Sequence, residues 1–223
     1  MLILMPEGAA PEVEPGILHP ARFDAACREL ACRDPRLAGC LAGAGPLLPP
    51  GRRPAGFAGL VRLILEQQVS VAAADAMWRK LAQRLGTVTP GGLLELDDDE
   101  LKTCGFSRPK IVYARGIANA VADRSLDFDA LAGLDDEAAV AELVRFKGIG
   151  RWSAECYLLF SLGREDIWPV DDLAIIVGMQ QLLGLAARPS KADLLSVAEA
   201  WRPWRSAAAL LVWHLYRSMR RKR

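Results

Sequence analysis

The chain has 223 residues, of which 52% are hydrophobic and 25% are charged, with a formal net charge of +1 at pH 7. This apolar content suffices for a buried core and excludes an intrinsically disordered chain, while the apolar runs are too short to span a membrane. An odd number of cysteines, 5 in all, and an N-terminus without signal-peptide features argue against a disulfide framework and predict a cytoplasmic protein.

Proline and glycine punctuate the first part of the chain. Residues 1–20 contain four prolines and are predicted to form an irregular arm, whereas residues 21–45 are predicted to form two short helices. Residues 45–51 are dominated by proline and glycine, which favours a linker. From there onward apolar residues recur at helical spacing, with no convincing run of strands and no internal repeat. The sequence therefore predicts an all-α fold.

Capping residues and glycines mark the limits of the helices that follow the linker. Ser70 is predicted to cap a helix that Gly86 ends, and Asp135, Asp171 and Ser190 are predicted to cap three later helices. The predicted ranges are 71–85, 97–105, 136–146, 151–162, 172–183 and 191–201, with one further helix capped by Ser107 and a last helix opened by Pro203.

Charged residues are distributed unevenly along these helices. The stretch from Glu95 to Glu142 is acidic, and no acidic residue follows Glu199. A basic face opposite an acidic one fits a polyanionic partner such as a nucleic acid, although a basic tail is also common as a solvated chain end. The basic residues after Glu199 are Arg202, Arg205, Arg217, Arg220, Arg221, Lys222 and Arg223.

Gly148-Ile149-Gly150 forms a predicted tight turn between two helices. Glycines on both sides of one apolar residue permit positive φ angles, so Ile149 can point inward and fix the turn to the core. The backbone N–H groups at the start of the second helix are then free to bind a phosphate without reading base sequence. A plain connection between two helices can carry the same glycines, so the turn alone leaves both interpretations open.

Two adjacent acids, Asp171 and Asp172, follow Pro169-Val170 and open an apolar helix. A single acid at this place is an ordinary cap, whereas two acids suggest that one caps the helix and the other has a separate role. A carboxylate held by the helix dipole and free N–H groups suits electrostatic stabilisation of a cationic transition state. The pair is therefore a candidate catalytic site.

The turn and the acids together resemble the helix-hairpin-helix–GPD superfamily of DNA glycosylases, and most closely the 3-methyladenine DNA glycosylase II branch in a compact, all-helical form. The resemblance covers residues 57–215. It implies base excision repair by hydrolysis of the N-glycosidic bond of alkylated purines such as 3-methyladenine and 7-methylguanine. It is carried by Gly148-Ile149-Gly150-Arg151-Trp152-Ser153-Ala154, Pro169-x-Asp171-Asp172, residues 63–70, residues 201–206 and Trp213.

The resemblance implies a fold of two helical lobes with a cleft between them. One lobe is expected to comprise residues 63–170 and to contain the helix-hairpin-helix motif at residues 143–162. Residues 21–62 and 171–223 are expected to form the other lobe, which then holds both chain termini. Asp172 would lie in the cleft.

The resemblance assigns Asp172 as the catalytic carboxylate, which would stabilise the oxocarbenium-like sugar and orient or activate the attacking water. Asp171 is then expected to cap the helix. Bifunctional members carry a lysine nucleophile where this chain has Trp152, so a monofunctional enzyme without strand cleavage is expected. The cysteine cluster of the endonuclease III branch is missing, so no iron–sulfur cluster and no cofactor are expected.

Other carried-over residues concern the damaged base. Trp152 and Trp213 are expected to offer indole faces to an electron-poor alkylated base, although tryptophans at helical spacing are also common in a core. Cys156 stands where the related branch has a tyrosine that faces the pocket, which leaves the range of substrates open. Gln68 is expected to fill the gap when the damaged nucleotide turns out of the helix, although a glutamine there is also common as a solvated terminus.

The resemblance also implies contacts to the DNA backbone by a monomer that binds double-stranded DNA with damaged bases and has no membrane partner. Arg108 and Lys110 are expected to touch DNA only weakly. A monovalent cation on the backbone carbonyls of Phe146 and Ile149 is compatible with the family, and no other metal is expected. The expected DNA-binding residues of the hairpin are Gly148, Gly150, Arg151 and Ser153.

Three other functions stay open from the sequence. The first is a glycosylase for another lesion, such as an oxidised or deaminated base, which a panel of substrates would distinguish. The second is a non-catalytic DNA-binding module that keeps the hairpin but has no use for Asp172 together with Trp152. The third is a helical interaction protein, in which the hairpin, the acid pair and the glutamine segment coincide by chance.

Overall fold

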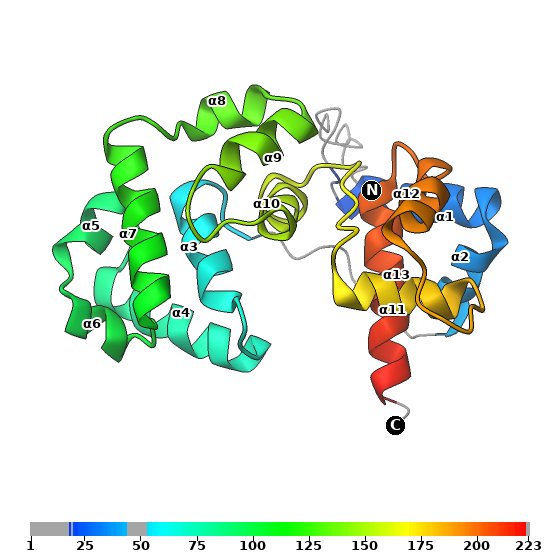
Figure 1. The fold of residues 1–223 in the computed structure, drawn as a ribbon, viewed down its shortest axis with the longest axis horizontal. Helices are drawn as coiled ribbons and strands as arrows, with labels where there is room; N and C mark the ends of the chain where they lie inside the picture. Colours follow the sequence, from blue (N-terminus) through cyan, green and yellow to red (C-terminus); the bar gives the residue numbers. More distant parts are fainter. Residues whose placement is uncertain (1–17, 19, 44–52, 222–223) are drawn as a thin grey trace, which may run out of the picture.

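The computed structural model describes residues 18, 20–43 and 53–221, and these residues form helices and no strand, which confirms the predicted all-α fold. Within this part of the chain, no helix combines the length and the apolar character that a membrane span requires. The elements (Figure 1) are α1 (Pro20–Arg33), α2 (Pro35–Gly43), α3 (Gly56–Glu66), α4 (Val71–Leu85), α5 (Pro90–Glu95), α6 (Asp98–Thr103), α7 (Arg108–Ala122), α8 (Phe128–Gly133), α9 (Asp136–Val144), α10 (Arg151–Tyr157), the π-helical segment η1 (Leu158–Leu162), α11 (Leu173–Leu182), α12 (Lys191–Glu199) and α13 (Arg205–Arg221).

Side-chain caps determine where several helices begin, as predicted. The Ser70 hydroxyl accepts a hydrogen bond from the amide three residues on at the start of α4, and Gly86 ends that helix with a φ of 68°. Asp97, Asp135 and Ser190 accept equivalent bonds at the starts of α6, α9 and α12. Each bond satisfies an amide without a partner inside the helix and contributes about 1 kcal/mol to stability.

Several predicted helix limits differ from the structure by one or two residues, and three further details of the helix ends also differ. Ser107 lies directly before α7, but its side chain makes no capping hydrogen bond. The last helix begins at Arg205, because Pro203 lies in the turn before it. The segment predicted as one helix over residues 151–162 is α10 followed by η1, and Gly163 ends it with a left-handed φ of 72°.

The helices form two groups, seen on the left and right of Figure 1. In the left group α7 packs against α3, α5 and α6, and α10 packs against α3 and α9. In the right group α13 packs against α1, α2 and α11. Helices from the two ends of the chain therefore share one group, as the implied two-lobed fold requires.

The lobe boundary that the sequence predicted between residues 62 and 63 falls inside α3. This helix packs against α4, α7 and α10, and one continuous helix does not divide between two cores. We therefore propose that the lobe with the hairpin begins before Gly56, while the boundary near residue 171 stays a prediction. The predicted arm at residues 1–20 and the linker at residues 45–51 lie almost entirely outside the described residues.

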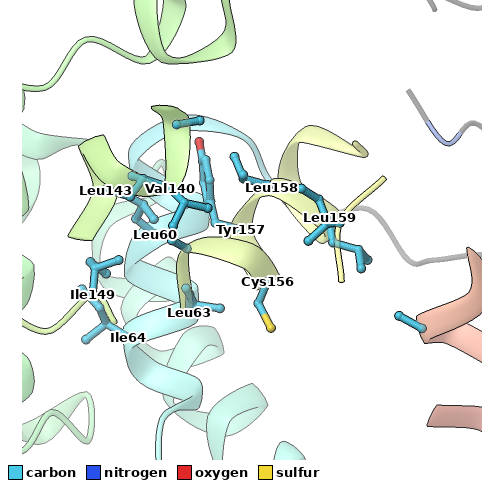
Figure 2. Close-up of a cluster of buried hydrophobic side chains, with 14 of the residues drawn as sticks. Leu60, Leu63, Ile64, Val140, Leu143, Ile149, Cys156, Tyr157, Leu158 and Leu159 are labelled. Atoms are coloured by element: carbon cyan, nitrogen blue, oxygen red, sulfur yellow. The ribbon is translucent and has the colours of Figure 1, made fainter. Parts of the chain in front are cut away.

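Ile149 fixes the hairpin turn to the core, as predicted. Its side chain is 4% exposed and belongs with Ile64 of α3 and Leu143 of α9 to the buried cluster in Figure 2. Tyr157 of α10 lies in the same cluster, and its hydroxyl accepts a hydrogen bond from the Gly56 amide at 2.8 Å. Burial of each large apolar side chain contributes about 1.5–3 kcal/mol, so the cluster holds three helices around the turn.

Trp168 and Trp201 hold the segment that leads to the two acids. Their rings meet edge to face with centroids 5.3 Å apart, and both side chains are buried. The Trp201 indole donates a hydrogen bond to Oδ2 of Asp34 at 3.0 Å, which ties the start of α2 to the turn before α13. The chain therefore enters α11 from a fixed position.

Candidate active site

The two glycines of the hairpin have different structural roles. Gly148 has a φ of +93°, and a Cβ atom there would overlap with the ring of Tyr113, so only glycine fits. Gly150 has an ordinary φ of −87° and open space where a Cβ atom would be. Of the two glycines that permit a positive φ angle, Gly148 adopts one and Gly150 does not. No side chain caps the start of α10, which Gly150 leaves open to a ligand.

The side chains of two predicted DNA-binding residues are engaged within the protein. The Arg151 guanidinium pairs with Glu137 of α9 at 2.6 Å and with Glu155 of α10 at 2.9 Å. Ser153 is buried, and its hydroxyl accepts a hydrogen bond from Nε2 of Gln67 at 3.3 Å. Contact of these two residues with DNA stays a prediction. Such a contact would be made by their backbone amides.

The expected wedge residue, Gln68, lies in the turn between α3 and α4. It is exposed and has a φ of +56°, a left-handed conformation that costs a residue other than glycine about 1–2 kcal/mol. Its neighbour Gln67 donates from Nε2 to the carbonyl of Gly148 at 2.9 Å and so ties this turn to the hairpin. Lys110, expected to touch DNA weakly, is buried instead and donates to the Leu65 carbonyl at 2.7 Å.

Asp172 is the residue on which three N–H donors converge. Its Oδ1 accepts hydrogen bonds from the Ile175 amide and from the Trp213 indole, each at 2.9 Å. Its Oδ2 accepts a hydrogen bond from the Trp152 indole at 2.7 Å. Donors from α10, α11 and α13 therefore fix the orientation of this carboxylate, and the start of α11 places a helix dipole against its charge.

The roles expected for the two acids are wrong in one respect. Asp171 does not cap α11, because its carboxylate pairs with Lys191 of α12 at 2.8 Å. Asp172 is itself the cap, and it also faces the two tryptophans. The cause lies in the preceding turn, where the Asp172 amide donates to the Pro169 carbonyl at 3.0 Å and places Asp172 directly before the first helical residue, Leu173.

A pocket of about 320 Å³ opens beside Asp172, within the size range of small-molecule sites. One wall carries the Trp152 ring, whose residue is 37% exposed. Another wall carries Trp213, on which Phe160 stacks with centroids 5.6 Å apart and 23° between the ring planes. The structure thus brings together the residues predicted for base binding and catalysis, namely Trp152, Cys156, Asp172 and Trp213.

Cys156 contributes a small, uncharged surface to this pocket. Burial raises the pKa of its thiol well above the usual range, so the side chain stays protonated and unreactive. Compared with the tyrosine that the resemblance implies at this place, cysteine offers less aromatic surface and leaves more open space in the pocket.

Two pocket residues, Arg53 and Phe160, were missed in the sequence. Phe160 follows Trp152 and Cys156 at intervals of four, and this helical spacing could have placed it on their face. The Arg53 guanidinium lies over the Phe160 ring, 4.7 Å from its centroid, and pairs with Glu66 at 2.7 Å. Arg53 belongs to no motif and follows the linker, so nothing in the sequence marked it. The remaining lining residues are Ala174, Leu210, Tyr216 and Arg217.

No group of three His, Cys, Asp or Glu side chains that could hold a metal ion occurs among the described residues. At the hairpin, the Phe146 carbonyl accepts a hydrogen bond from the Ile149 amide at 3.0 Å. The monovalent cation expected on the carbonyls of Phe146 and Ile149 stays a prediction.

Comparison with known families places this site in context. A family model described as "HhH-GPD superfamily base excision DNA repair protein" matches residues 61–204, which include the hairpin, the acids and the turn that carries Gln68. DNA-3-methyladenine glycosylase 1 of Schizosaccharomyces pombe is 34% identical over 158 residues, 69% of this chain and 69% of that protein. DNA-3-methyladenine glycosylase 2 of Escherichia coli is 32% identical over 200 residues, 83% of this chain and 68% of that protein.

Solved structures show the same fold. A DNA-3-methyladenine glycosidase from Bacillus halodurans matches with a TM-score of 0.77 and 31% identity, covering 88% of this chain and 91% of that one. The 3-methyladenine DNA glycosylase of Schizosaccharomyces pombe, solved in complex with abasic DNA, matches with a TM-score of 0.72 and 30% identity, covering 86% and 95%. Both likenesses extend over nearly the whole of the solved chains.

Proposed function

Since the chain belongs to the helix-hairpin-helix–GPD superfamily of base excision DNA repair proteins, we propose that it is a monofunctional DNA glycosylase that hydrolyses the N-glycosidic bond of alkylated purines. The relatives named as 3-methyladenine glycosylases support this class of substrate. Asp172 is the catalytic carboxylate in this proposal, and Trp152 and Trp213 bind the base.

The observation that carries the proposal is the position of Asp172 between two indole rings at the wall of an open pocket. Hydrogen bonds from Trp152, Trp213 and the α11 backbone hold its negative charge in one place before any substrate arrives. Such preorganised charge is the main means by which a protein stabilises a cationic transition state. The same two rings attract an electron-poor or cationic base through their faces.

In the proposed reaction the bond between C1′ of the sugar and the purine nitrogen breaks, and both bonding electrons leave with the base. The Asp172 carboxylate stabilises the positive charge that develops on the sugar. A water molecule then adds to C1′, and the proton that it loses passes to Asp172 or to solvent. A cationic alkylated purine leaves as a neutral molecule, so its departure requires no proton donor.

The proposal includes a monomer that acts on double-stranded DNA in the cytoplasm. One chain supplies the pocket, the hairpin and the exposed Gln68, so no second subunit is needed for the chemistry. Gln68 would fill the gap that the flipped nucleotide leaves in the helix. The open start of α10 at Gly150 would bind a backbone phosphate.

Incubation with methylated duplex DNA, followed by chromatography of the released bases, tests this proposal. We expect 3-methyladenine and 7-methylguanine to be released and unmethylated duplex DNA to release no base. Oxidised and deaminated duplexes form the second half of the panel. If only an oxidised or a deaminated base is released, the chain is a glycosylase of another specificity, and if no base is released while DNA is bound, it is a non-catalytic module.

A further inference from the structure

Arg53 places a positive charge in a pocket that is proposed to receive a cationic base. Its backbone amide donates to the Phe160 carbonyl at 3.0 Å, and its guanidinium lies over the Phe160 ring, 4.7 Å from the centroid. The Phe160 ring in turn stacks on Trp213, whose indole donates to Asp172. Arg53 is therefore fixed in the same wall as the catalytic carboxylate and lines the same pocket.

The carboxylate partner of Arg53 is shared. One oxygen of Glu66 forms an ion pair with Arg53 at 2.7 Å, and the other accepts a hydrogen bond from Arg62 at 3.1 Å. One negative charge thus faces two guanidinium groups, although Arg62 has Asp75 as a second partner. A guanidinium carries five N–H donors, of which the Glu66 contact uses few. Arg53 therefore keeps donors and positive charge for a group inside the pocket.

A cationic base has no evident use for such a residue, whereas a neutral base does. When a neutral purine leaves, the bonding electrons make it an anion that needs a hydrogen-bond donor or a proton. Asp172 only accepts hydrogen bonds in this site, and the raised pKa of the buried Cys156 thiol makes it a weak acid. Two guanidinium groups, Arg53 and Arg217, line the pocket. Arg53 is the one held against the Phe160 ring that stacks on Trp213, and its donors suit a carbonyl oxygen or a ring nitrogen of the departing base.

We propose that Arg53 is a specificity-determining residue that extends the enzyme to neutral purines bearing a carbonyl oxygen, by donating hydrogen bonds to the departing base. This rests on the proposed glycosylase function. The bond between C1′ and the purine nitrogen breaks with both electrons on the base, and Arg53 stabilises the resulting anion. Water forms the new bond to C1′, and its released proton reaches the base through solvent, so the products are the free base and an abasic sugar.

The test compares release of hypoxanthine and of 7-methylguanine from matched duplexes by the full chain and by Arg53→Gln. We expect the ratio of the hypoxanthine rate to the 7-methylguanine rate to fall by about tenfold or more, as for the loss of a charge-assisted hydrogen bond. Arg53→Lys keeps the positive charge but lacks the planar guanidinium, so its ratio of the two rates should lie between those of the unsubstituted chain and of Arg53→Gln. Arg62→Gln is the matched control, because Arg62 also pairs with Glu66 but does not line the pocket, and it should leave the ratio unchanged.

The outcomes separate this inference from the function on which it rests. Failure of the unsubstituted chain to release any methylated base would refute the proposed function. Release of 7-methylguanine without hypoxanthine, or an equal loss of both activities in Arg53→Gln, would overturn the role of Arg53 alone. An Arg62→Gln variant that lowers the ratio as far as Arg53→Gln would assign the effect to the Glu66 ion pairs instead. Melting temperatures of all variants show whether folding is retained.

Discussion

The indole nitrogen of Trp152 donates a hydrogen bond to Oδ2 of Asp172 over 2.7 Å, across the gap between the hairpin helix α10 and the start of α11. The resemblance to known glycosylases implied only a stacking face for Trp152. The structure adds a second role, because the same ring that walls the pocket also orients the carboxylate. In the proposed function, base binding and charge placement would therefore be coupled through one side chain.

Trp152→Phe and Trp152→Ala separate these two roles. Phenylalanine keeps an aromatic face but loses the donor to Asp172, whereas alanine loses both. We expect Trp152→Phe to lower the turnover of 7-methylguanine more than its binding, and Trp152→Ala to weaken binding further by about 1–3 kcal/mol, the usual worth of base–aromatic stacking. Single-turnover kinetics over a range of enzyme concentrations measure the two effects. Equal kinetics for both variants would mean that the ring face is unimportant.

Asp172→Asn is expected to abolish base release while leaving the fold nearly intact. Asparagine can still accept the hydrogen bond from the Ile175 amide and cap α11, so the free energy of unfolding should change little. Loss of the negative charge should cost about 3 kcal/mol or more of transition-state stabilisation, by analogy with other electrostatic sites. The control is Asp171→Asn, which breaks only the pair with Lys191 and should keep most activity. The opposite pattern would identify Asp171 as the catalytic acid.

The reaction is expected to leave an intact strand with an abasic site. Strand cleavage by a glycosylase requires an amine that forms a Schiff base with the sugar, and the position used by lysine in bifunctional relatives is Trp152 here. Lys110 is buried against the Leu65 carbonyl and does not line the pocket. Borohydride reduction during turnover should therefore trap no protein–DNA adduct. A covalent adduct that survives denaturation would contradict a monofunctional enzyme.

The hairpin glycines allow a matched test of DNA binding. Gly150→Ala fits the ordinary φ and the open space, so it should fold normally yet place a methyl group where a phosphate would approach. Gly148→Ala would overlap with Tyr113 at a positive φ, and it should lower the free energy of unfolding by about 1–3 kcal/mol. We expect Gly150→Ala to weaken duplex binding and to reduce the salt slope by up to about 0.9, the value of one phosphate contact. Unchanged binding and slope would remove the α10 amides from the DNA contact.

Most of the fold could be predicted because long amphipathic helices show apolar residues at helical spacing and capping residues at their ends. Among the helices without a predicted range, α5 and α8 have 6 residues each, which is too short for a helical period to be distinguished from chance. The limit that we propose between the lobes, before Gly56, differs from the predicted one because the same apolar stripe of α3 continues across residues 62 and 63. The helices that pack against this stripe are determined by tertiary contacts, and the local sequence does not predict those contacts.

Site residues that lie within one sequence motif could be predicted, whereas site residues that separate segments bring together in space could not. Asp172 and Trp152 lie in compact motifs, and the pocket contains both. The cap assignment to Asp171 was wrong because either acid suits a helix start, and only the turn geometry decides between them. Arg53 reaches the pocket from outside the hairpin and acid motifs by a contact with Phe160, which the order of residues does not reveal.

Glu155 is buried on α10 against Arg151. Burial raises its pKa from the ordinary 4.5 to about 7. Between these values the folded protein binds more protons than the unfolded chain, so the free energy of unfolding falls as pH rises and levels off above about 7, by roughly 3 kcal/mol in total. Glu155→Gln should flatten this profile in denaturant titrations between about pH 5 and 8. The control is Glu137→Gln, because Glu137 pairs with the same arginine but hydrogen bonding to Arg151 lowers its pKa, which places its titration below this window. A wild-type slope that survives in Glu155→Gln would show that another group takes up the proton.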